Sequence, residues 1–501
     1  MLVPEMIYRA ARRYADQPAL WFEGRTRTFA EVKQDADRLA LALRFRYGLQ
    51  RGTPIGILAS NGLNSIALDF GCAIGGLLRV PLNARLSSHE QQGMLSRIGV
   101  RHLLHTTDLA ERARQLAALD PGLSLVSIED DLLGVEAPDG KLEPAQADDP
   151  LIALYTSGTT GTLKAAVHTH GTYAAVVRNI LNNLIEPRPG DVMLHAASLI
   201  HASGTFVLPY WIRGAAAAIL PGFIPSEYLK AVAASRSTAL NLVPTMIGML
   251  LETPGVEDAD FSHVRDIIYG ASPMPQPVLR RAIQTFGPKF SQYYGQTEAP
   301  LCITVLDKVD HEDDSTWTAC GRPSLDVEIR LLDEAGNEAP VGEPGEIALR
   351  APFVMRGYHQ APDLNAQTFT DDGFIRTRDI GRFDDRGLLY LIDRASDMIV
   401  TGGYNVYPRE VEDVLTDHPA VIEAVAVGLP DDKWGEAVTG FVILREPVEE
   451  DDIIAFCRER LAGYKTPKSI HIVDSLPKSP VGKLLRRAVR EPFWTDKGLV
   501  R

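Results

Sequence analysis

Short apolar runs alternate with helical patterns along most of this 501-residue chain, and this alternation restricts the fold more than any other feature. The run PIGILAS at residues 54–60 has the composition of a buried strand, and NGLNSIALDFGCAIGGLL after it reads as a helix. The alternation recurs at DVMLHAA, AAAAIL, ALNLVP and DIIYGAS. Strands that alternate with helices form α/β layers with largely parallel sheets. An α/β fold with several lobes is therefore expected for the large N-terminal part.

The pattern changes twice towards the C-terminus. From about residue 325 to residue 393, DVEIRLLDEAGNEAP, GEIALR and LLYLIDR resemble strands joined by acidic glycine turns, which predicts a β-rich subdomain. A proline-initiated helical pattern, two strand patterns and a helix with an acidic start follow, and they predict a compact α+β module. We therefore expect a large N-terminal domain over residues 1–393 and a small C-terminal domain over residues 394–501.

Composition narrows the classes of function. The formal net charge of −14 argues against general binding to nucleic acids or to anionic membranes. No metal-ligand spacing is found among the four cysteines, and unpaired thiols fit a reducing cytosol; they are Cys72, Cys302, Cys320 and Cys457. The sequence offers no transmembrane segment and no signal peptide, so we expect a cytoplasmic protein. It gives no prediction of the oligomeric state.

The most informative local feature is a loop rich in glycine and hydroxyl groups that follows a buried strand, in LIALYTSGTTGTLK. Glycines let a backbone wrap closely around a ligand, and hydroxyls, exposed N–H groups and a lysine bind phosphate oxygens. The spacing differs from that of the Walker loop. A polar turn without a ligand is the alternative, and the dense hydroxyl string that ends in lysine disfavours it. The candidate phosphate-binding residues are Thr156, Ser157, Gly158, Thr159, Thr160, Gly161 and Lys164.

This loop resembles the phosphate-binding signature of the adenylate-forming superfamily, which contains acyl-CoA synthetases, peptide-synthetase adenylation domains and firefly-type luciferases. Proline and glycine are usual in that signature where this chain has Leu163 and Ala165. Further superfamily motifs follow in the expected order over roughly residues 8–487. The resemblance implies that ATP, with Mg²⁺, activates a carboxylic acid as an acyl-adenylate, and that coenzyme A then accepts the acyl group. It also implies a mobile C-terminal domain that serves both half-reactions.

The segment YGQTE at residues 294–298 resembles a second superfamily motif. By this resemblance Tyr294 stacks on adenine, with Tyr293 and Gly295 beside it. Thr297 is implied to contact the adenylate phosphate, and Glu298 to hold Mg²⁺, which suits a carboxylate because Mg²⁺ prefers hard oxygen ligands. The loop that lines the adenine and acyl pocket in the superfamily is matched here by Gly270, Ala271 and Ser272.

Two motifs near the predicted domain boundary imply contacts with ribose. FIRTRD at residues 374–379 resembles W-x-x-T-G-D, in which the aspartate, here Asp379, accepts hydrogen bonds from both ribose hydroxyls. Arg378 replaces the usual glycine, so the backbone conformation at this position needs to be tested. DRASD at residues 393–397 resembles the hinge motif, which implies that Arg394 contacts ribose and phosphate and that Ser396 is the pivot.

The C-terminal motifs imply residues for each half-reaction. Gly402, Gly403 and Tyr404 resemble the loop that lines the coenzyme A tunnel. PKSPVGK resembles the catalytic-lysine motif, so Lys483 is implied to approach the acid carboxylate and the α-phosphate during adenylation. The resemblance also implies that Lys483 is a target for a lysine acyltransferase, which would remove the charge that adenylation needs.

The acid is not readable from the sequence. His201 begins HASG, which resembles the HxxG motif near the acyl entrance, and a catalytic gate and a structural histidine are equal alternatives. The other candidate pocket segments are residues 241–246, 269–272 and 292–295, and the bulky Tyr269 is expected to shorten the pocket floor. No cationic pair suggests a dicarboxylate, so we favour a fatty or aromatic monocarboxylate. A stand-alone enzyme that loads a carrier protein, a luciferase-like oxygenase and a non-catalytic acyl or nucleotide sensor are the alternatives.

Overall fold

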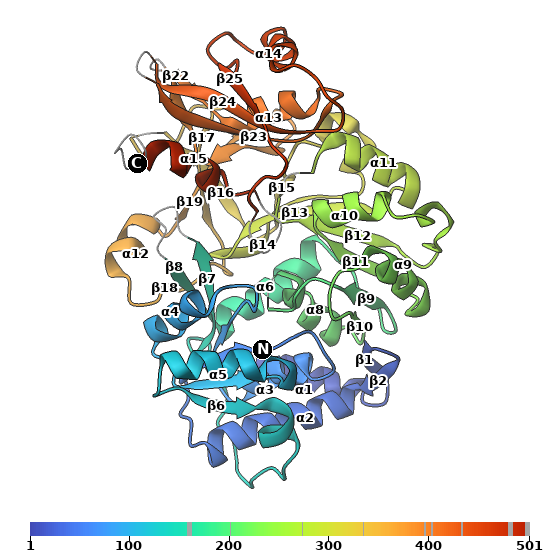
Figure 1. Cartoon of the computed structure of the whole chain (residues 1–501). Coiled ribbons are helices and arrows are strands. Elements are labelled where there is room, and N and C mark those ends of the chain that lie inside the picture. The colour runs from blue at the N-terminus through green and yellow to red at the C-terminus, as the bar shows by residue number, and fades with distance from the viewer. Residues whose placement is uncertain are drawn as a thin grey trace. The chain divides into compact units, whose positions relative to one another are not determined.

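The computed structural model describes residues 1–157, 163–200, 202–272, 274–333, 335–394, 397–401, 404–431, 434–478 and 484–495 (Figure 1). It divides into two compact units. Unit 1 comprises Met1–Glu328 and Arg350–Ile375, and unit 2 comprises Ile329–Leu349 and Arg376–Arg501. This division groups most of the predicted β-rich subdomain with the C-terminal segment. The expected domain boundary next to Arg394 stays a prediction.

One sheet of unit 1 carries nine of the described strands, most of them parallel to their neighbours. The antiparallel exceptions are at its two edges. In spatial order the strands are β15 (Arg322–Pro323), β14 (Ala299–Leu306), β13 (Phe290–Gln296), β12 (Asp266–Gly270), β11 (Ala239–Leu242), β9 (Val192–His195), β10 (Ala216–Ile219), β1 (Pro18–Phe22) and β2 (Arg25–Thr28).

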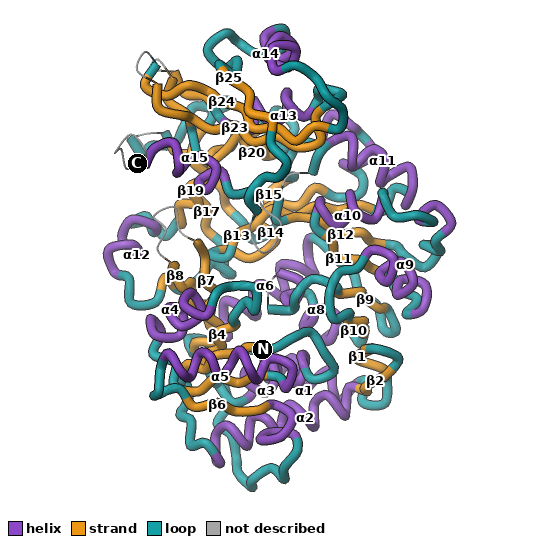
Figure 2. The backbone as a smooth tube through the Cα atoms, viewed as in Figure 1, coloured by secondary structure: helices purple, strands orange, loops and turns teal. Residues whose placement is uncertain are grey.

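Helices cover both faces of this sheet, as the alternating pattern predicts. Side chains alternate between the faces along each strand. Ala217 and Ile219 pack with residues of α1 (Val3–Arg13), α6 (His170–Asn183) and α8 (Val207–Ile212), and we call this side the α6 face. Leu240 and Tyr269 pack with residues of α9 (Pro225–Ala234), α10 (Pro244–Leu251) and α11 (Gln276–Phe286), which form the α9–α11 face (Figure 2).

The second sheet of unit 1 also contains a parallel core. Its described strands are, in spatial order, β18 (Gly357–Tyr358), β8 (Leu163–Thr169), β7 (Pro150–Ser157), β4 (Leu78–Pro81), β3 (Pro54–Leu58), β5 (His102–His105) and β6 (Ser124–Ser127). The remaining described α-helices of unit 1 are α2 (Phe29–Leu41), α3 (Ser65–Ile74), α4 (Ser88–Ile98), α5 (Ala110–Leu119), α7 (Ala202–Thr205) and α12 (Pro362–Thr368). Local sequence sets their ends: α4 begins with a Ser87–Glu90 capping box and ends at Gly99, whose φ is +76°.

Unit 2 contains the predicted β-rich and α+β segments. A four-stranded sheet consists of β16 (Glu328–Leu332), β17 (Gly345–Arg350), β19 (Ile375–Phe383) and β20 (Leu389–Arg394). A second sheet consists of β22 (Tyr404–Val406), β21 (Ile399–Thr401), β24 (Gly435–Leu444) and β23 (Val421–Asp431), with β25 (Ser469–Ile472) paired to β24. Its described α-helices are α13 (Pro408–Thr416), α14 (Glu450–Arg458) and α15 (Arg486–Thr495). As predicted, a proline begins α13, and acidic residues occupy the first turn of α14.

No α-helix in the described parts of either unit is long and apolar enough to cross a membrane.

Candidate active site

The predicted phosphate loop joins two antiparallel strands of unit 1. Thr156 at the end of β7 pairs with Lys164 in β8, so both ends of the loop are fixed by the sheet. Ser157 is the last residue of β7. Four of the predicted loop residues lie outside the described residues, namely Gly158, Thr159, Thr160 and Gly161. The strand frame therefore places Thr156 and Lys164 beside each other, as a phosphate cradle requires.

Thr297 and Glu298 form the two-residue tip of the hairpin between β13 and β14, because Gln296 pairs with Ala299. A side chain at Gly295 would lie 2.3 Å from the carbonyl oxygen of Leu301, so only glycine fits at this close approach. The buried His168 donates from Nε2 to the carbonyl oxygen of Thr297 at 2.8 Å. Burial lowers the pKa of His168 to about 4, so the ring is neutral and serves to position the hairpin tip.

Tyr358 connects this hairpin tip to the phosphate-loop strand. The short strand β18 pairs Tyr358 with Ala166 of β8. The Tyr358 hydroxyl donates to Oε1 of Glu298 at 2.5 Å, and its ring centroid lies 5.9 Å from Nζ of Lys164. One aromatic side chain thus contacts both a predicted phosphate-binding cation and the predicted metal-binding carboxylate. Tyr358 could not be predicted from the sequence, because a lone tyrosine in VMRGYH carries no recognisable signal.

The residues around Glu298 fit a Mg²⁺ ion that is shared with a substrate. Mg²⁺ is usually bound by one or two carboxylates together with substrate phosphates, rather than by a cage of protein ligands. In the portions of the chain that are described, no group of three or more His, Cys, Asp or Glu side chains could hold a metal. The single oriented carboxylate of Glu298, next to Lys164, is therefore the arrangement that a Mg²⁺ site shared with substrate phosphates needs.

The predicted adenine-pocket loop follows β12, next to β13. Gly270 pairs with Tyr293, and a Cβ atom at Gly270 would lie 2.6 Å from the Tyr293 carbonyl oxygen. Ala271 has a φ of +68°, a left-handed conformation that costs a non-glycine residue about 1–2 kcal/mol. Ser272 follows it. The structure therefore brings the loop and Tyr293 together and holds Ala271 in a strained conformation of the kind found at functional sites.

The two adjacent tyrosines of β13 point to opposite faces of the sheet. Tyr293 is buried on the α6 face, where its ring meets Phe206 edge-on at a centroid distance of 5.9 Å. Tyr294 is also buried and points the other way. Tyr269 lies on the α9–α11 face, and its hydroxyl pairs with Nε2 of His311 at 2.9 Å. Tyr269 is thus a residue of the hydrophobic core, which differs from the expectation that it shortens the floor of the acyl pocket.

Asp379 is held in the four-stranded sheet of unit 2. It is 6% exposed and lies in β19, where it pairs with Arg394 of β20. Arg378 has a φ of +63°, and its backbone N–H donates to Oε1 of Glu346 at 3.1 Å. The position that is usually glycine in the superfamily therefore keeps a left-handed conformation in this chain, and arginine adopts it at a conformational cost.

The other predicted residues of unit 2 lie in or beside short segments that are not described. Ser396, Gly402, Gly403 and Lys483 are outside the described residues, as is His201 of unit 1. Tyr404 begins β22 and pairs with Thr401, so the predicted tunnel loop joins β21 to β22. Lys478 forms a β-bridge with Leu484, and the predicted catalytic lysine lies between these two residues in the sequence.

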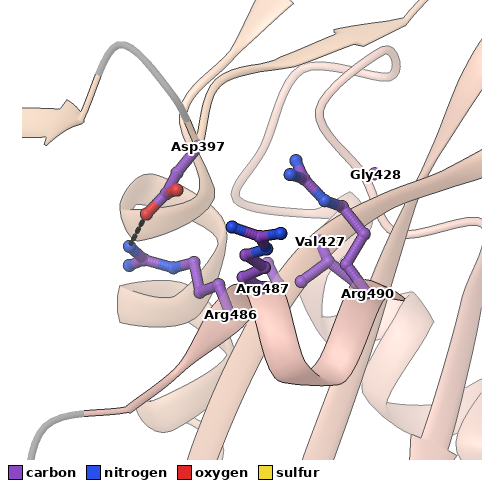
Figure 3. Close-up of a pocket in the computed structure, with 7 residues that line it drawn as sticks. Asp397, Val427, Gly428, Arg486, Arg487 and Arg490 are labelled. Atoms are coloured by element: carbon purple, nitrogen blue, oxygen red, sulfur yellow. Dashed lines mark hydrogen bonds and ion pairs between the residues drawn. The ribbon is translucent and has the colours of Figure 1, made fainter. Parts of the chain in front are cut away.

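Arg486 connects helix α13 with Asp397, which follows the predicted hinge, and all three lie within unit 2. Its guanidinium forms two hydrogen bonds with Glu412 of α13, at 2.7 and 2.5 Å. It also forms an ion pair with Asp397 at 3.1 Å (Figure 3). Asp397 directly follows the predicted pivot, and Arg486 lies three residues after the predicted catalytic lysine. A small pocket beside them is lined by Asp397, Ala426, Val427, Gly428, Arg486, Arg487 and Arg490.

The fold and these sites together define an adenylate-forming enzyme with a large α/β part and a smaller C-terminal part. Residues 7–359 match the model of the AMP-binding enzyme family, and residues 410–483 match that of the AMP-binding enzyme C-terminal domain. The chain belongs to the AMP-binding enzyme family. The predicted resemblance and fold class are confirmed, and so are the predicted cofactors, since adenylate-forming ligases use ATP and Mg²⁺, with coenzyme A as the substrate of CoA ligases.

Similar proteins act on different acids and acceptors. The chain is 36% identical to the medium/long-chain-fatty-acid–CoA ligase FadD8 of Mycobacterium tuberculosis, over 98% of this chain and 90% of the relative. It is 33% identical to the fatty acid–[acyl-carrier-protein] ligase ScoC of Streptomyces coeruleorubidus, over 96% and 94%. The structure of the amide bond synthetase McbA from Marinactinospora thermotolerans matches with a TM-score of 0.90 at 28% identity, over 98% and 100%.

Proposed function

We propose that this protein is an AMP-forming acid:CoA ligase that acts on a fatty or aromatic monocarboxylic acid. The observation that carries the proposal is the contact of Tyr358 with both Glu298 and Lys164. Through this contact Tyr358 orients the Glu298 carboxylate next to the Lys164 cation, beside the predicted phosphate loop. A phosphoryl-transfer site requires such a carboxylate and such a cation. The similarity to FadD8 over 98% of the chain supports coenzyme A as the acceptor and a fatty acid as the substrate.

In the first half-reaction, a carboxylate oxygen of the acid attacks the α-phosphorus of ATP, and the bond to the β-phosphate oxygen breaks. Thr156 and Lys164 bind phosphate oxygens, and Asp379 accepts hydrogen bonds from the ribose hydroxyls. Lys483 offsets the negative charge that develops on the α-phosphate as pyrophosphate leaves. Glu298 would hold Mg²⁺, which neutralises phosphate charge when it is bound.

In the second half-reaction, the thiolate of coenzyme A attacks the acyl carbonyl carbon, a thioester forms and AMP leaves with the electron pair of the broken acyl–oxygen bond. Gly402 and Gly403 present no side chains, which suits a segment that packs against the narrow pantetheine arm. Rotation of the C-terminal domain at Ser396 would exchange Lys483 for this segment. One site can then serve two reactions in turn.

The experiment that tests this function measures both products for a panel of fatty and aromatic acids. We expect acid-dependent pyrophosphate release from ATP and Mg²⁺, and equal amounts of AMP and acyl-CoA when coenzyme A is present. Adenylation without acyl-CoA formation would contradict the CoA acceptor. In that case the purified enzyme should be tested with acyl carrier protein, the acceptor named for ScoC, and with amines, because McbA is an amide bond synthetase.

A further inference from the structure

Strand β18 lies at the edge of the seven-stranded sheet, as far as that sheet is described. Its two residues, Gly357 and Tyr358, pair with β8 on one side. An edge strand presents backbone N–H and C=O groups that have no neighbouring strand as a partner. A side chain or a water molecule must therefore bond to these groups if the edge strand is to be held in one position.

The side chain of Asn365 in α12 takes the place of a neighbouring strand. Its Oδ1 accepts a hydrogen bond from the backbone N–H of Tyr358 at 2.8 Å. Its Nδ2 donates to the backbone carbonyl oxygen of Tyr358 at 3.0 Å. A carboxamide offers both a donor and an acceptor, as a peptide group does, so one side chain can bond to both backbone groups of one residue. The backbone of Tyr358 is therefore held by β8 and by Asn365.

The local sequence on both sides of this contact suits it. Gly357 has a φ of +149°, which residues with a side chain rarely adopt, and a Cβ atom there would lie 3.2 Å from both Oδ1 and Nδ2 of Asn365. Asparagine is a weak helix former, because its side chain competes for backbone hydrogen bonds. Asn365 nevertheless lies inside α12, where its own N–H bonds to the Ala361 carbonyl oxygen at 2.9 Å. A rare backbone angle and a weak helix former thus coincide at one contact, which indicates that the amide has a positioning role.

The position of the Tyr358 backbone determines where its hydroxyl lies relative to Glu298. The hydroxyl donates to Oε1 of Glu298 at 2.5 Å. A tyrosine side chain is a rigid ring with two rotatable bonds, so a displaced backbone also displaces the hydroxyl. A hydrogen bond weakens steeply when its distance and angle leave the preferred range. Loss of the Asn365 contact would therefore leave the Glu298 carboxylate less well oriented for a metal ion.

We propose that Asn365 is a positioning residue for Mg²⁺-dependent adenylation, and that it acts through the backbone of Tyr358 on the carboxylate of Glu298. This inference rests on the proposed function. The three residues all lie within unit 1, so the effect requires no movement of unit 2. Asn365 should therefore influence the first half-reaction and leave the second unchanged, because pyrophosphate has left with its Mg²⁺ before the thioester forms.

The test is Asn365→Ala, which removes both hydrogen bonds to Tyr358. We expect the Mg²⁺ concentration for half-maximal pyrophosphate release to rise about three- to tenfold, less than the effect of about 10–100-fold that is usual when a direct partner of a metal ligand is lost. A second measurement needs no turnover. Mn²⁺ suits the same oxygen ligands as Mg²⁺, so its affinity for the complex of protein and ATP, without acid, is measured by electron paramagnetic resonance and should fall by the same factor.

A double-mutant cycle with Tyr358→Phe tests whether the effect passes through Tyr358. In the Tyr358→Phe background, Asn365→Ala should cause no further fall in Mn²⁺ affinity, because no hydroxyl remains to be positioned. Asn365→Asp is the second variant, for use if Asn365→Ala does not fold. It keeps the shape and the acceptor but places an oxygen opposite the Tyr358 carbonyl oxygen, so Mn²⁺ affinity should fall in the same direction.

Asn183→Ala is the matched control, because Asn183 also uses both amide atoms to bond to the backbone. Its Oδ1 accepts from the N–H of Leu325 at 2.9 Å, and its Nδ2 donates to the carbonyl oxygen of Asn179 at 2.8 Å. Loss of these bonds should leave the Mg²⁺ and Mn²⁺ dependence unchanged, even if it lowers Tm.

The outcomes separate this inference from the proposed function. If no acid supports pyrophosphate release, the proposed function fails, and the Mn²⁺ comparison still tests the inference. Unchanged Mn²⁺ affinity in a folded Asn365 variant overturns the inference. An equal fall of affinity in the wild-type and Tyr358→Phe backgrounds also overturns it, because Asn365 would then act independently of the Tyr358 hydroxyl.

Discussion

The two units position their functional segments by different means. In unit 1, the Glu298 hairpin tip is held by main-chain pairing, including a bond from the N–H of Met355 to the carbonyl oxygen of Glu298 at 2.8 Å. In unit 2, the segments beside the predicted hinge and the predicted catalytic lysine are connected by side-chain ion pairs of Arg486. Main-chain pairing survives most substitutions, whereas an ion pair is lost with one side chain and weakens in salt. The predicted metal-binding hairpin of unit 1 should therefore be rigid, and the segments of unit 2 beside the predicted catalytic lysine should be easier to perturb.

The largest effect is expected from Lys483→Ala, which removes the predicted catalytic charge of unit 2. Adenylation should fall by about 10²–10³-fold, the usual cost of losing one charge-stabilising group at such a site. Thioester formation from pre-made acyl-adenylate should be retained. The control is Lys478→Ala, because Lys478 forms an ion pair with Glu423 at 2.9 Å and is 38% exposed. Near-normal pyrophosphate release by Lys483→Ala would remove this residue from the first half-reaction.

Tyr358→Phe tests the connection in unit 1. Loss of the hydroxyl frees the Glu298 carboxylate, and removal of a group that orients a metal ligand costs about 10–100-fold in metal affinity or activity. We expect a higher Mg²⁺ concentration for half-maximal pyrophosphate release. Tyr155→Phe is the control, since that hydroxyl donates at 2.5 Å to the Met94 carbonyl oxygen rather than to Glu298. Equal Mg²⁺ dependence in both variants would show that Tyr358 does not orient the carboxylate.

Arg486→Gln tests the ion-pair connection of unit 2. The variant should lose about 2 kcal/mol of unfolding free energy, because hydrogen bonds to charged groups contribute about 1.5–3 kcal/mol. Its ratio of adenylation rate to thioesterification rate should also change, since Arg486 holds Asp397 beside the predicted pivot. The neighbouring Arg487 pairs with Glu491 at 3.6 Å on an exposed surface, so Arg487→Gln should cost less than 1 kcal/mol. Similar losses in both variants, with an unchanged rate ratio, would contradict the positioning role.

The smallest effect is expected from Arg378→Gly. Glycine adopts a φ of +63° without strain, but it also gains freedom in the unfolded chain. Relief of backbone strain stabilises the folded state, and the added freedom of glycine stabilises the unfolded chain. Because these two effects oppose each other, the unfolding free energy should rise by at most about 1 kcal/mol. Denaturant unfolding measures this change. A loss of stability would show that Arg378 makes contacts that outweigh its backbone strain.

Contiguous motifs were predictable from the sequence, and contacts between distant segments were not. Thr297 and Glu298 lie within one short motif, and the structure places them together at one hairpin tip. The Tyr358–Glu298 bond joins residues 60 positions apart, so no local pattern reports it. The surroundings of Tyr269 could not be predicted because β12 is buried on both faces, and a strand that is apolar throughout does not reveal which face each side chain takes.

The most direct test of Mg²⁺-dependent adenylation at Glu298 is the Mg²⁺ dependence of acid-dependent exchange between pyrophosphate and ATP, compared between the wild type and Glu298→Gln. Exchange requires reversible acyl-adenylate formation, and it needs no acyl acceptor. We expect exchange by the wild type with at least one fatty or aromatic acid. We also expect that Glu298→Gln needs more Mg²⁺, because a neutral amide is a poorer ligand for a hard cation. Absence of exchange with every acid, or identical Mg²⁺ curves for the two proteins, would contradict Mg²⁺-dependent adenylation at Glu298.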